Sequence, residues 1–313
     1  MSEIHSYHGQ PVLKQPTWTW EIPCYFFTGG LGGASAGVAY LCDCRGDRDS
    51  ARRAWAAALV GVSVSPVLLI SDLGRPARFL NMLRMVKITS PMSIGSWILA
   101  ISGTSTTIAA AHAWIGLFPR LSRFARPLAA LMGLPLSSYT AALIANTAVP
   151  VWHDARSSLP FVFVAGAGLS AGAALLPLTP VDQAHLARRL ALGGAVAELG
   201  LTDLMKRGLG DQKQAYESGA SRTFDRAATA TISAGATLLA IYGRRSRTAS
   251  AGAGALLLAG ALSTRWSIYR AGFNSAADPA SIIGPQRERI KRRNPRGGAK
   301  PDPGTPPPSA APR

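Results

Sequence analysis

The sequence has very few cysteines, and this limits the redox groups that the chain itself can carry. Its three thiols, Cys24, Cys42 and Cys44, cannot supply the four thiolates of an iron–sulfur cluster, and no Cys-x-x-Cys spacing occurs. We therefore expect no iron–sulfur cluster and no metal site in this chain. We also expect the three thiols to be unbridged.

Acidic residues and strand patterns are scarce too. The 313 residues include 33 Lys and Arg but only 16 Asp and Glu, which gives a net charge of +17, although 48% of the residues are hydrophobic. Nowhere do apolar and polar residues alternate as they do in a half-buried strand. Charged and apolar residues are instead segregated along the chain, so the sequence predicts an all-α fold with apolar helices and basic loops.

The apolar stretches have the length of membrane-spanning helices. About twenty apolar residues cross the core of a bilayer, and in lipid the backbone has to satisfy its own hydrogen bonds. The sequence therefore predicts a polytopic membrane helix bundle with about eight transmembrane helices, near 23–42, 54–72, 92–115, 127–149, 159–178, 184–205, 226–243 and 250–270. A soluble helical protein would have to bury nearly every helix on all sides, and we do not expect it.

One glycine-rich stretch, at Gly29, Gly30, Gly32 and Gly33, falls inside the first expected span. It lacks the lysine and the strand-to-helix context of a phosphate-binding loop. Because small residues allow helices to approach closely in lipid, we interpret these glycines as helix-contact positions.

Two polar ends flank the expected bundle of residues 22–272. The N-terminal segment, residues 1–21, has no basic region followed by an apolar core and a cleavage site, so we expect no removable signal. The C-terminal tail, residues 273–313, is basic and then rich in proline, and we expect it to be disordered. Such a tail can also bind nucleic acid, but for a bundle of spans we expect the lipid bilayer, and no nucleic acid, as its partner.

An even number of spans puts both termini on one side, here called the terminal side, together with the loops 72–91, 150–158 and 206–225. Lys and Arg are divided almost equally between the loops of the two sides, so the loops alone do not decide the orientation. The basic tail favours the side that carries anionic lipid. We therefore expect a multi-pass protein of the cell membrane with its termini in the cytoplasm.

Ionisable and amide side chains within the expected spans gather toward the terminal side. Such groups are costly in lipid and usually face a cavity, a partner charge or a working site. The residues concerned are Glu21, Asp72, Asn146, Glu198, Asp203 and Arg265. A cluster of this kind suits a polar ligand whose chemistry moves protons. The alternative is that Glu198 or Asp203 only pairs with Arg265 to hold helices together.

Four segments resemble the NrfD / polysulfide reductase membrane-subunit family. They are "WTWEIPCYFFTGGLGGASAG" at 18–37, "SDLGRPARFLNMLRMVKITSPMSIGSWIL" at 71–99, "YTAALIANTAVPVW" at 139–152 and "DPASIIGPQR" at 278–287. The resemblance implies an eight-span subunit without haem that exchanges electrons between menaquinone and a ferredoxin-like iron–sulfur subunit. That subunit is in turn joined to a molybdopterin oxidoreductase, so this chain alone is not expected to be an enzyme.

The resemblance also implies a quinone site close to the surface where the iron–sulfur subunit docks. Carried over by motif, the quinone-binding residues are Trp20, Tyr25, Asp72, Arg75, Arg78 and Asn146. Some relatives have His and Asn before the "YFF" motif, whereas this chain has Trp18, Trp20 and Glu21. We therefore place Glu21 and Tyr139 as proton partners of the quinone, and we expect Glu198 and Asp203 to extend a proton path from it.

Three other functions remain open at this point. A haem-b membrane anchor needs two histidines on facing helices, and His112 and His185 both lie near the end opposite the termini. A secondary transporter would bind its substrate at mid-membrane, whereas these polar residues lie toward one face. A passive membrane anchor would hold a soluble enzyme without binding quinone. The sequence does not name the electron donor or acceptor; formate, polysulfide and thiosulfate all fit, and formate is our expectation.

Overall fold

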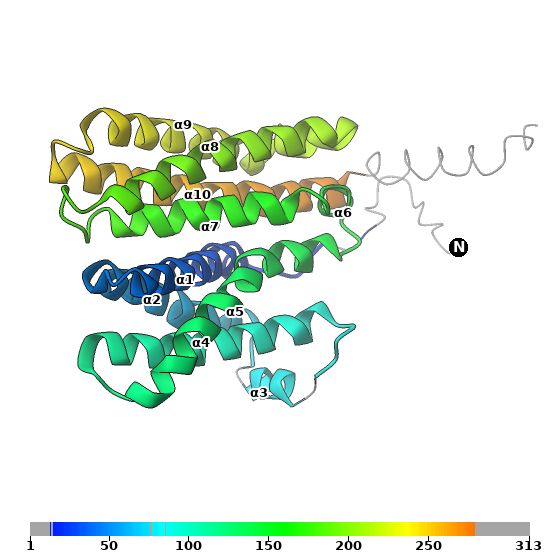
Figure 1. Ribbon diagram of the computed structural model, residues 1–313. Helices are drawn as coiled ribbons and strands as arrows, with labels where there is room; N and C mark the ends of the chain where they lie inside the picture. Colours follow the sequence, from blue (N-terminus) through cyan, green and yellow to red (C-terminus); the bar gives the residue numbers. More distant parts are fainter. Residues whose placement is uncertain (1–12, 14, 76, 85, 279–313) are drawn as a thin grey trace, which may run out of the picture.

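In a computed structural model, described for residues 13, 15–75, 77–84 and 86–278, the chain is an all-α bundle (Figure 1). The described residues contain no strand. Eight long helices are α1 Glu21–Cys44, α2 Arg48–Asp72, α4 Pro91–Ile115, α5 Pro119–Ala145, α7 Leu159–Leu175, α8 His185–Gly208, α9 Gly219–Tyr242 and α10 Arg247–Ala277. Three short elements are α3 Ala77–Leu83, α6 Pro150–Asp154 and the 3₁₀ helix η1 Gly210–Tyr216. Most of the expected tail lies outside the described residues.

The long helices run between the same two ends of the bundle (Figure 1). Among the described residues, α2, α4 and α5 are long and apolar enough to cross a membrane, and α7 is a shorter apolar helix. Large apolar side chains such as Val60, Val67, Leu134 and Phe161 are more than half exposed on the outside of the bundle, as a lipid-facing surface requires. The prediction of an all-α membrane helix bundle is confirmed. The number of eight crossings stays a prediction.

Several helices begin earlier than the apolar pattern predicted. The fourth expected span was 127–149, but α5 starts at Pro119 and includes Arg120, Arg123 and Arg126. Arginines in the first turns of a helix can lie at the membrane interface with their charged ends in water, so the apolar run underestimates the length of the helix. Pro119 occupies the first turn of α5, where its missing N–H has no hydrogen bond to lose.

The helices form two groups of four, which meet through α1 and α7. Helices α1, α2, α4 and α5 pack on one another, and so do α7, α8, α9 and α10. Helix α1 also contacts α7 and α10, and α7 also contacts α5. Figure 1 shows α4 at one edge of the bundle and α9 at the other, with α1 and α7 between them.

Glycines on α1 allow this central position. A Cβ on Gly32 would lie 2.9 Å from the backbone nitrogen of Val62 on α2, and a Cβ on Gly33 would lie 2.5 Å from the carbonyl oxygen of Gly133 on α5. A Cβ on Gly30 would lie 3.3 Å from Ala167 on α7. The prediction that these are helix-contact glycines is therefore confirmed for three of the positions, and it explains how α1 touches three neighbours at once.

The turn after α2 places a short helix across the terminal side. Helix α2 ends at Asp72, and Gly74 follows with a φ of 66°, a left-handed conformation that favours glycine. The chain then forms α3 and returns into the bundle at Ser90, whose hydroxyl caps α4 by accepting a hydrogen bond from the Ser93 N–H. The loop that the sequence singled out for its arginines is thus a helical crossover beside α4.

The core differs between the two ends of the bundle. Toward the terminal side, the buried cluster contains most of the large aromatic side chains, among them Tyr25, Phe26, Trp152 and Phe163. Toward the opposite end, the buried cluster is dominated by alanines and leucines, with Trp55 as its largest side chain. Small alanine side chains thus dominate the core at the opposite end, and bulky aromatic rings fill the core at the terminal side.

Candidate functional site

Thr19 joins the start of α1 to the end of α2. Its backbone N–H donates to Asp72 Oδ1 at 3.1 Å, and its hydroxyl lies 2.8 Å from the same oxygen. The hydroxyl also hydrogen-bonds a carboxylate oxygen of Glu21, and the other oxygen of Glu21 accepts a hydrogen bond from Ser71 at 3.3 Å. Two predicted site residues from different helices therefore meet at one threonine.

The single Thr19 hydroxyl links the two carboxylates. A threonine hydroxyl has one hydrogen, so it can donate to Glu21 or to Asp72 but not to both. At the terminal side of the bundle, its hydrogen bond to one carboxylate therefore competes with its hydrogen bond to the other.

A cavity lies next to this group, between α1, α2, α3, α4 and α5. It has a volume of about 50 Å³, and Asp72 is its acidic wall. The lining residues are Trp18, Ile22, Tyr25, Phe26, Leu69, Asp72, Leu73, Met82, Met92, Ser96, Tyr139 and Leu143. Three of the predicted site residues, Tyr25, Asp72 and Tyr139, thus share one cavity.

Tyr139 fits into this cavity because the facing position on α4 is a glycine. A Cβ on Gly95 would overlap the end of the Tyr139 ring, including its hydroxyl oxygen. No other residue type leaves the ring where it is. The sequence analysis did not single out Gly95, and only the packing of α4 against α5 reveals its role.

Trp18 forms the wall on the other side, and its position is fixed by two contacts. Its ring stacks on Trp152 with centroids 5.8 Å apart, and its carbonyl oxygen accepts a hydrogen bond of 2.5 Å from the Tyr269 hydroxyl. Trp152 in turn donates its indole N–H to the Ile268 carbonyl at 2.8 Å. Trp20, two residues after Trp18, was predicted to bind quinone, but it is 58% exposed and does not line the cavity.

Met82 and Met92 form the outer wall of the cavity. Both side chains are flexible and unbranched, and Met92 is more than half exposed. The cavity is smaller than the roughly 300–1,000 Å³ of a typical small-molecule pocket. A bicyclic ring therefore fits only if one or both methionines turn outward, which their position at the surface allows.

Three further predicted residues lie near the cavity but outside its lining. Arg75 and Arg78 are exposed on the crossover between α2 and α4. Asn146 is exposed at the C-terminal end of α5, where its side-chain amide donates to the Ala142 carbonyl at 2.8 Å. The structure thus places these residues on the surface around the cavity, not in it.

Glu198 lies elsewhere, in a buried ion pair between α7, α8 and α10. Arg265 Nη1 is 3.7 Å from Glu198 Oε1, and both side chains are at most 3% exposed. The Arg265 guanidinium also covers the Phe163 ring at 4.1 Å and donates to the Phe163 carbonyl at 3.0 Å. Gly166 makes this possible, because a Cβ there would lie 2.7 Å from Glu198 Oε1. Glu198 therefore pairs with Arg265 across two helices, while both of its carboxylate oxygens are buried without a hydrogen-bond partner in the described structure.

Asp203 is not part of this buried pair. Its carboxylate lies 2.6 Å from Arg207 on the same helix, and the two side chains are 59% and 75% exposed. Asp203 follows Glu198 by five residues, and at this spacing the two side chains lie on different faces of the helix. The structure therefore does not bring Asp203 to Glu198 or to the cavity.

One aromatic contact links the buried pair to the cavity. Phe163, which lies under Arg265, packs against Phe26 with ring centroids 5.7 Å apart. Phe26 is itself a lining residue of the cavity. The two polar groups of the bundle are thus separated by two aromatic rings.

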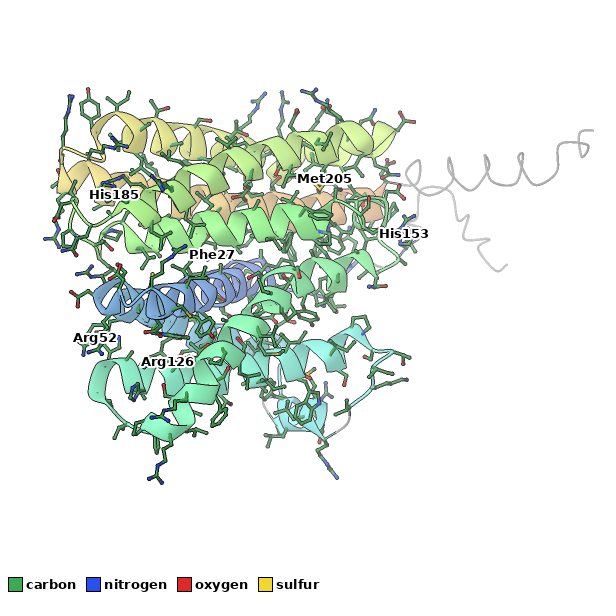
Figure 2. All side chains as sticks on the ribbon, in the orientation of Figure 1. Phe27, Arg52, Arg126, His153, His185 and Met205 are labelled. Atoms are coloured by element: carbon green, nitrogen blue, oxygen red, sulfur yellow. The ribbon has the colours of Figure 1, made fainter. Side chains whose placement is uncertain are left out.

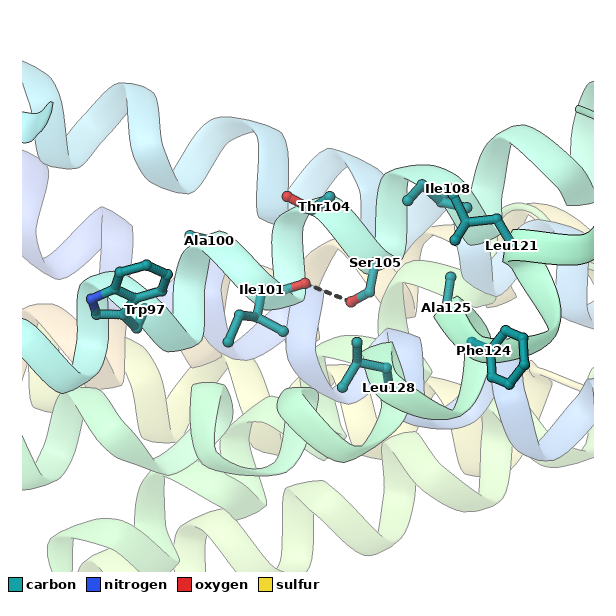
Figure 3. A pocket seen from close by; sticks show the side chains of 10 residues that line it. All are labelled: Trp97, Ala100, Ile101, Thr104, Ser105, Ile108, Leu121, Phe124, Ala125 and Leu128. Carbon is teal, nitrogen blue, oxygen red and sulfur yellow. Dashed lines mark hydrogen bonds between the residues drawn. The ribbon is translucent and has the colours of Figure 1, made fainter. Parts of the chain in front are cut away.

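A larger groove between α4 and α5 differs in character from this cavity. Its volume is about 350 Å³, and its wall is formed by apolar side chains with few hydroxyls (Figure 3). The Ser105 hydroxyl there donates to the Ile101 carbonyl of its own helix at 2.7 Å. None of the predicted site residues lines this groove.

The histidines of the described residues are spread over both ends of the bundle. Figure 2 shows His153 at the terminal side and His185 near the opposite end, toward the end where Arg52 lies. His185 Nδ1 lies 3.2 Å from Arg188 Nη2, and His112 Nδ1 lies 3.3 Å from the Leu117 carbonyl oxygen. His112 is on α4 and His185 on α8, which belong to different halves of the bundle, so these two do not form a facing pair.

These observations define a class: an integral membrane helix bundle with a small, mostly apolar cavity, walled on one side by Asp72, at the end where α1 begins and α10 ends. The family model NrfD_2, described as polysulfide reductase, matches residues 6–277. The chain belongs to the NrfD family, and the resemblance found in its sequence is confirmed. No match was found among curated proteins.

Proposed function

We propose that this chain is the quinone-reactive membrane subunit of an oxidoreductase complex. It would exchange electrons and protons between menaquinone and a ferredoxin-like iron–sulfur subunit, which serves a molybdopterin oxidoreductase of the formate dehydrogenase or polysulfide/thiosulfate reductase type. The observation that carries the proposal is the cavity lined by Tyr25, Tyr139 and Asp72 beside the Glu21–Thr19–Asp72 group. Membership of the NrfD family, whose members pair with oxidoreductase subunits, supports it.

The residues of the cavity suit a flat ring with polar edges. Trp18, Tyr25, Phe26 and Tyr139 supply aromatic walls, and aromatic faces stack well on other ring systems. The Ser96 and Tyr139 hydroxyls and the Asp72 carboxylate supply polar groups at its edge. Met82 and Met92 can turn outward, and this would give the ring the space that it needs. When bound, a quinone supplies the redox chemistry, and the protein supplies binding, orientation and proton exchange.

Each polar residue has a distinct role in this proposal. The Tyr139 hydroxyl, positioned by Gly95, would donate a hydrogen bond into the cavity. Asp72 would accept a proton there and pass it to the Thr19 hydroxyl, with Glu21 as the second carboxylate. Glu21 is thus assigned to the proton route behind the cavity, since it does not line the cavity itself.

The iron–sulfur subunit would dock on the terminal side. Arg75 and Arg78 are exposed there, close in the sequence to Asp72, and Trp20 presents an exposed ring beside Glu21. Arg and Trp are enriched among residues that dominate binding at protein interfaces. These three predicted quinone ligands are therefore reassigned, within this proposal, to the docking surface.

The test is quinol oxidation by the purified complex. We expect Tyr139→Phe and Asp72→Asn each to lower the rate roughly a hundredfold, the range for loss of a proton-transfer group. Tyr242→Phe is the matched control, because Tyr242 is exposed at the opposite end of the bundle. Wild-type rates in both cavity variants, in complexes of unchanged subunit composition, would overturn the proposal.

The remaining functions give different results in the same preparation. A passive anchor would not bind a quinone analogue, whereas the proposed subunit binds one and loses it in the Asp72→Asn variant. A haem-b anchor would show a Soret band. Mild detergent should co-purify the chain with an iron–sulfur protein, and the sequence of that partner would identify the electron donor.

A further inference from the structure

A third hollow lies on the outer surface between α2, α3 and α4. Its volume is about 480 Å³. Most of its lining is apolar, and its lining residues include Val62, Pro66, Phe79, Leu83, Leu99 and Gly103. It is much larger than the cavity at Asp72, and we call it the α2–α4 groove.

The residues of α4 that line the cavity and the groove form one continuous stripe. Met92 and Ser96 line the cavity, and Leu99, Gly103 and Thr107 line the groove. Spacings of three and four residues place all five on the same face of a helix. From Ser96 to Thr107 this stripe is roughly 16 Å long, at 1.5 Å per residue.

Helix α2 carries a matching stripe in the opposite direction. Leu73 and Leu69 line the cavity, and Pro66 and Val62 line the groove. The spacings are again three and four residues, so these side chains follow one face of α2 from its end at the terminal side toward the middle of the bundle. The cavity and the α2–α4 groove therefore lie along the same pair of helix faces.

Helix α3 lies where the two hollows adjoin. Its Met82 lines the cavity, whereas Phe79 and Leu83 line the groove. No residue of α3 is buried. The Ser96 hydroxyl is 3.5 Å from the Met82 carbonyl but only 2.9 Å from the carbonyl of Ser93, to which it donates more favourably. Few contacts thus hold α3 in its place between the cavity and the groove.

We propose that the α2–α4 groove binds the isoprenoid tail of the quinone whose ring occupies the cavity. Helix α3 would then cover the point where ring and tail join. This inference rests on the proposed function. The occupant follows from the geometry: the mostly apolar groove follows the same faces of α2 and α4 as the cavity and continues from it toward the middle of the bundle. A ligand with a polar ring and a long hydrocarbon chain would occupy both hollows at once.

The groove between α4 and α5 does not serve this purpose. It is lined from α5 by Leu121 to Leu128, whereas the cavity is lined from α5 by Tyr139 and Leu143. Eleven residues of helix, roughly 16 Å, separate Leu128 from Tyr139. No residue of α3 lines that groove.

Gly103 allows a clean test, because a Cβ there meets nothing within 4 Å. Gly103→Leu should fill the groove without disturbing the helix packing. We expect the KM for a long-tailed menaquinol to rise roughly tenfold, as expected when methylene contacts in an apolar site are lost. The KM for a tailless naphthoquinol should not change. Gly193→Leu on α8 is the matched control, since Gly193 also has open space around it.

The outcomes separate the two proposals. Equal effects of Gly103→Leu on both quinols, or no effect on either, would overturn the tail site, the latter being the result if only a membrane lipid occupies the groove. Failure of the unaltered complex to oxidise any quinol would instead overturn the proposed function.

A measurement on the unaltered complex avoids dependence on any variant. A long-tailed quinone with a photoreactive group in its chain should label peptides from α2 and α4 that include Pro66 and Gly103. Labelling confined to the Leu121–Leu128 region of α5, or to α7–α10, would contradict the tail site.

Discussion

The Thr19 hydroxyl contacts both Glu21 and Asp72. Because it contacts both carboxylates, its removal separates them without changing either acid. The threonine lies before α1, outside any apolar pattern, and its partner Asp72 is 53 residues away in the sequence. Its role therefore depends wholly on how α1 and α2 are placed side by side.

Thr19→Val keeps the shape of the side chain and removes the bridge. We expect quinol oxidation to fall about tenfold or more, at the lower edge of the effects of proton-transfer groups, and the pH dependence of the rate to change because the hydroxyl no longer links the two acids. Thr17→Val, two residues earlier and also exposed, is the control. A rate and pH profile like those of the unaltered complex would contradict the bridge.

Glu198 and Arg265 form a buried ion pair, and the pairing of their charges affects the stability of the bundle. Removing one member of a buried ion pair leaves an unpaired charge, which costs about 3–5 kcal/mol. We expect Arg265→Met to lower the melting temperature in detergent strongly. The double variant Glu198→Gln with Arg265→Met should recover most of the loss, since no buried charge remains. A double variant as unstable as the single one would argue against pairing as the main role.

The same residues test the predicted proton path. Glu198→Gln removes the buried acid, and Asp203→Asn removes an exposed acid that pairs with Arg207. If the path passes through the second half of the bundle, Glu198→Gln alone should slow quinol oxidation. Asp203→Asn should be close to wild type because its side chain lies on the surface. Equal rates of quinol oxidation in the unaltered complex, the Glu198→Gln variant and the Asp203→Asn variant would exclude a proton path through Glu198.

At the scale of helices, α1 organises the bundle by close backbone contact. Gly32 meets α2, Gly33 meets α5 and Gly30 meets α7, so one helix holds three neighbours. Helix α3 is the opposite case, because it has no buried residue and its contacts are mainly with α4. The two elements therefore differ in what they contribute: α1 fixes the fold, and α3 borders the cavity and the groove.

Gly33→Val tests the role of α1. Its side chain would press on the Gly133 carbonyl, a backbone atom that cannot rotate away. We expect a loss of about 3 kcal/mol or more, at the upper end of overpacking effects, seen as a lower melting temperature in detergent. Gly37→Val, with open space around Gly37 on the same helix, should be close to wild type. Equal stability of the two variants would contradict the close-contact interpretation.

At the scale of the whole molecule, the orientation in the membrane decides on which side electrons are exchanged. The loops of the two sides carry similar numbers of basic residues, so the loops alone do not settle the orientation. The structure offers a natural probe, because Cys44 is exposed at the end opposite the termini, while Cys42 is buried and Cys24 is partly buried. One accessible thiol therefore reports one side of the membrane.

With the termini in the cytoplasm, a membrane-impermeant maleimide should label Cys44 in intact cells. The Cys44→Ser variant should lose the label, which separates it from reaction at the other two thiols. Labelling that appears only after the membrane is opened would place the termini, the cavity and the proposed docking surface on the outer side.

The class of fold can be read from the residues in order, without the structure. The uncharged stretches predict where the helices lie, and the glycines indicate that α1 is a contact helix. The motifs indicate the NrfD family. These features are local, because hydrophobic length and small-residue spacing can be read along one segment. Sequence reasoning also placed Tyr25, Asp72 and Tyr139 in one site, through the family motif.

Which of the gathered charges lie together depends on how the helices pack. Glu198 and Asp203 are five residues apart in sequence, yet one is buried against Arg265 and the other is exposed with Arg207. The bridge at Thr19, the room made by Gly95 and the stripes that join the cavity to the groove each involve two helices distant in sequence. Burial and contact depend on which helix faces meet, and that is a property of packing that no single segment encodes.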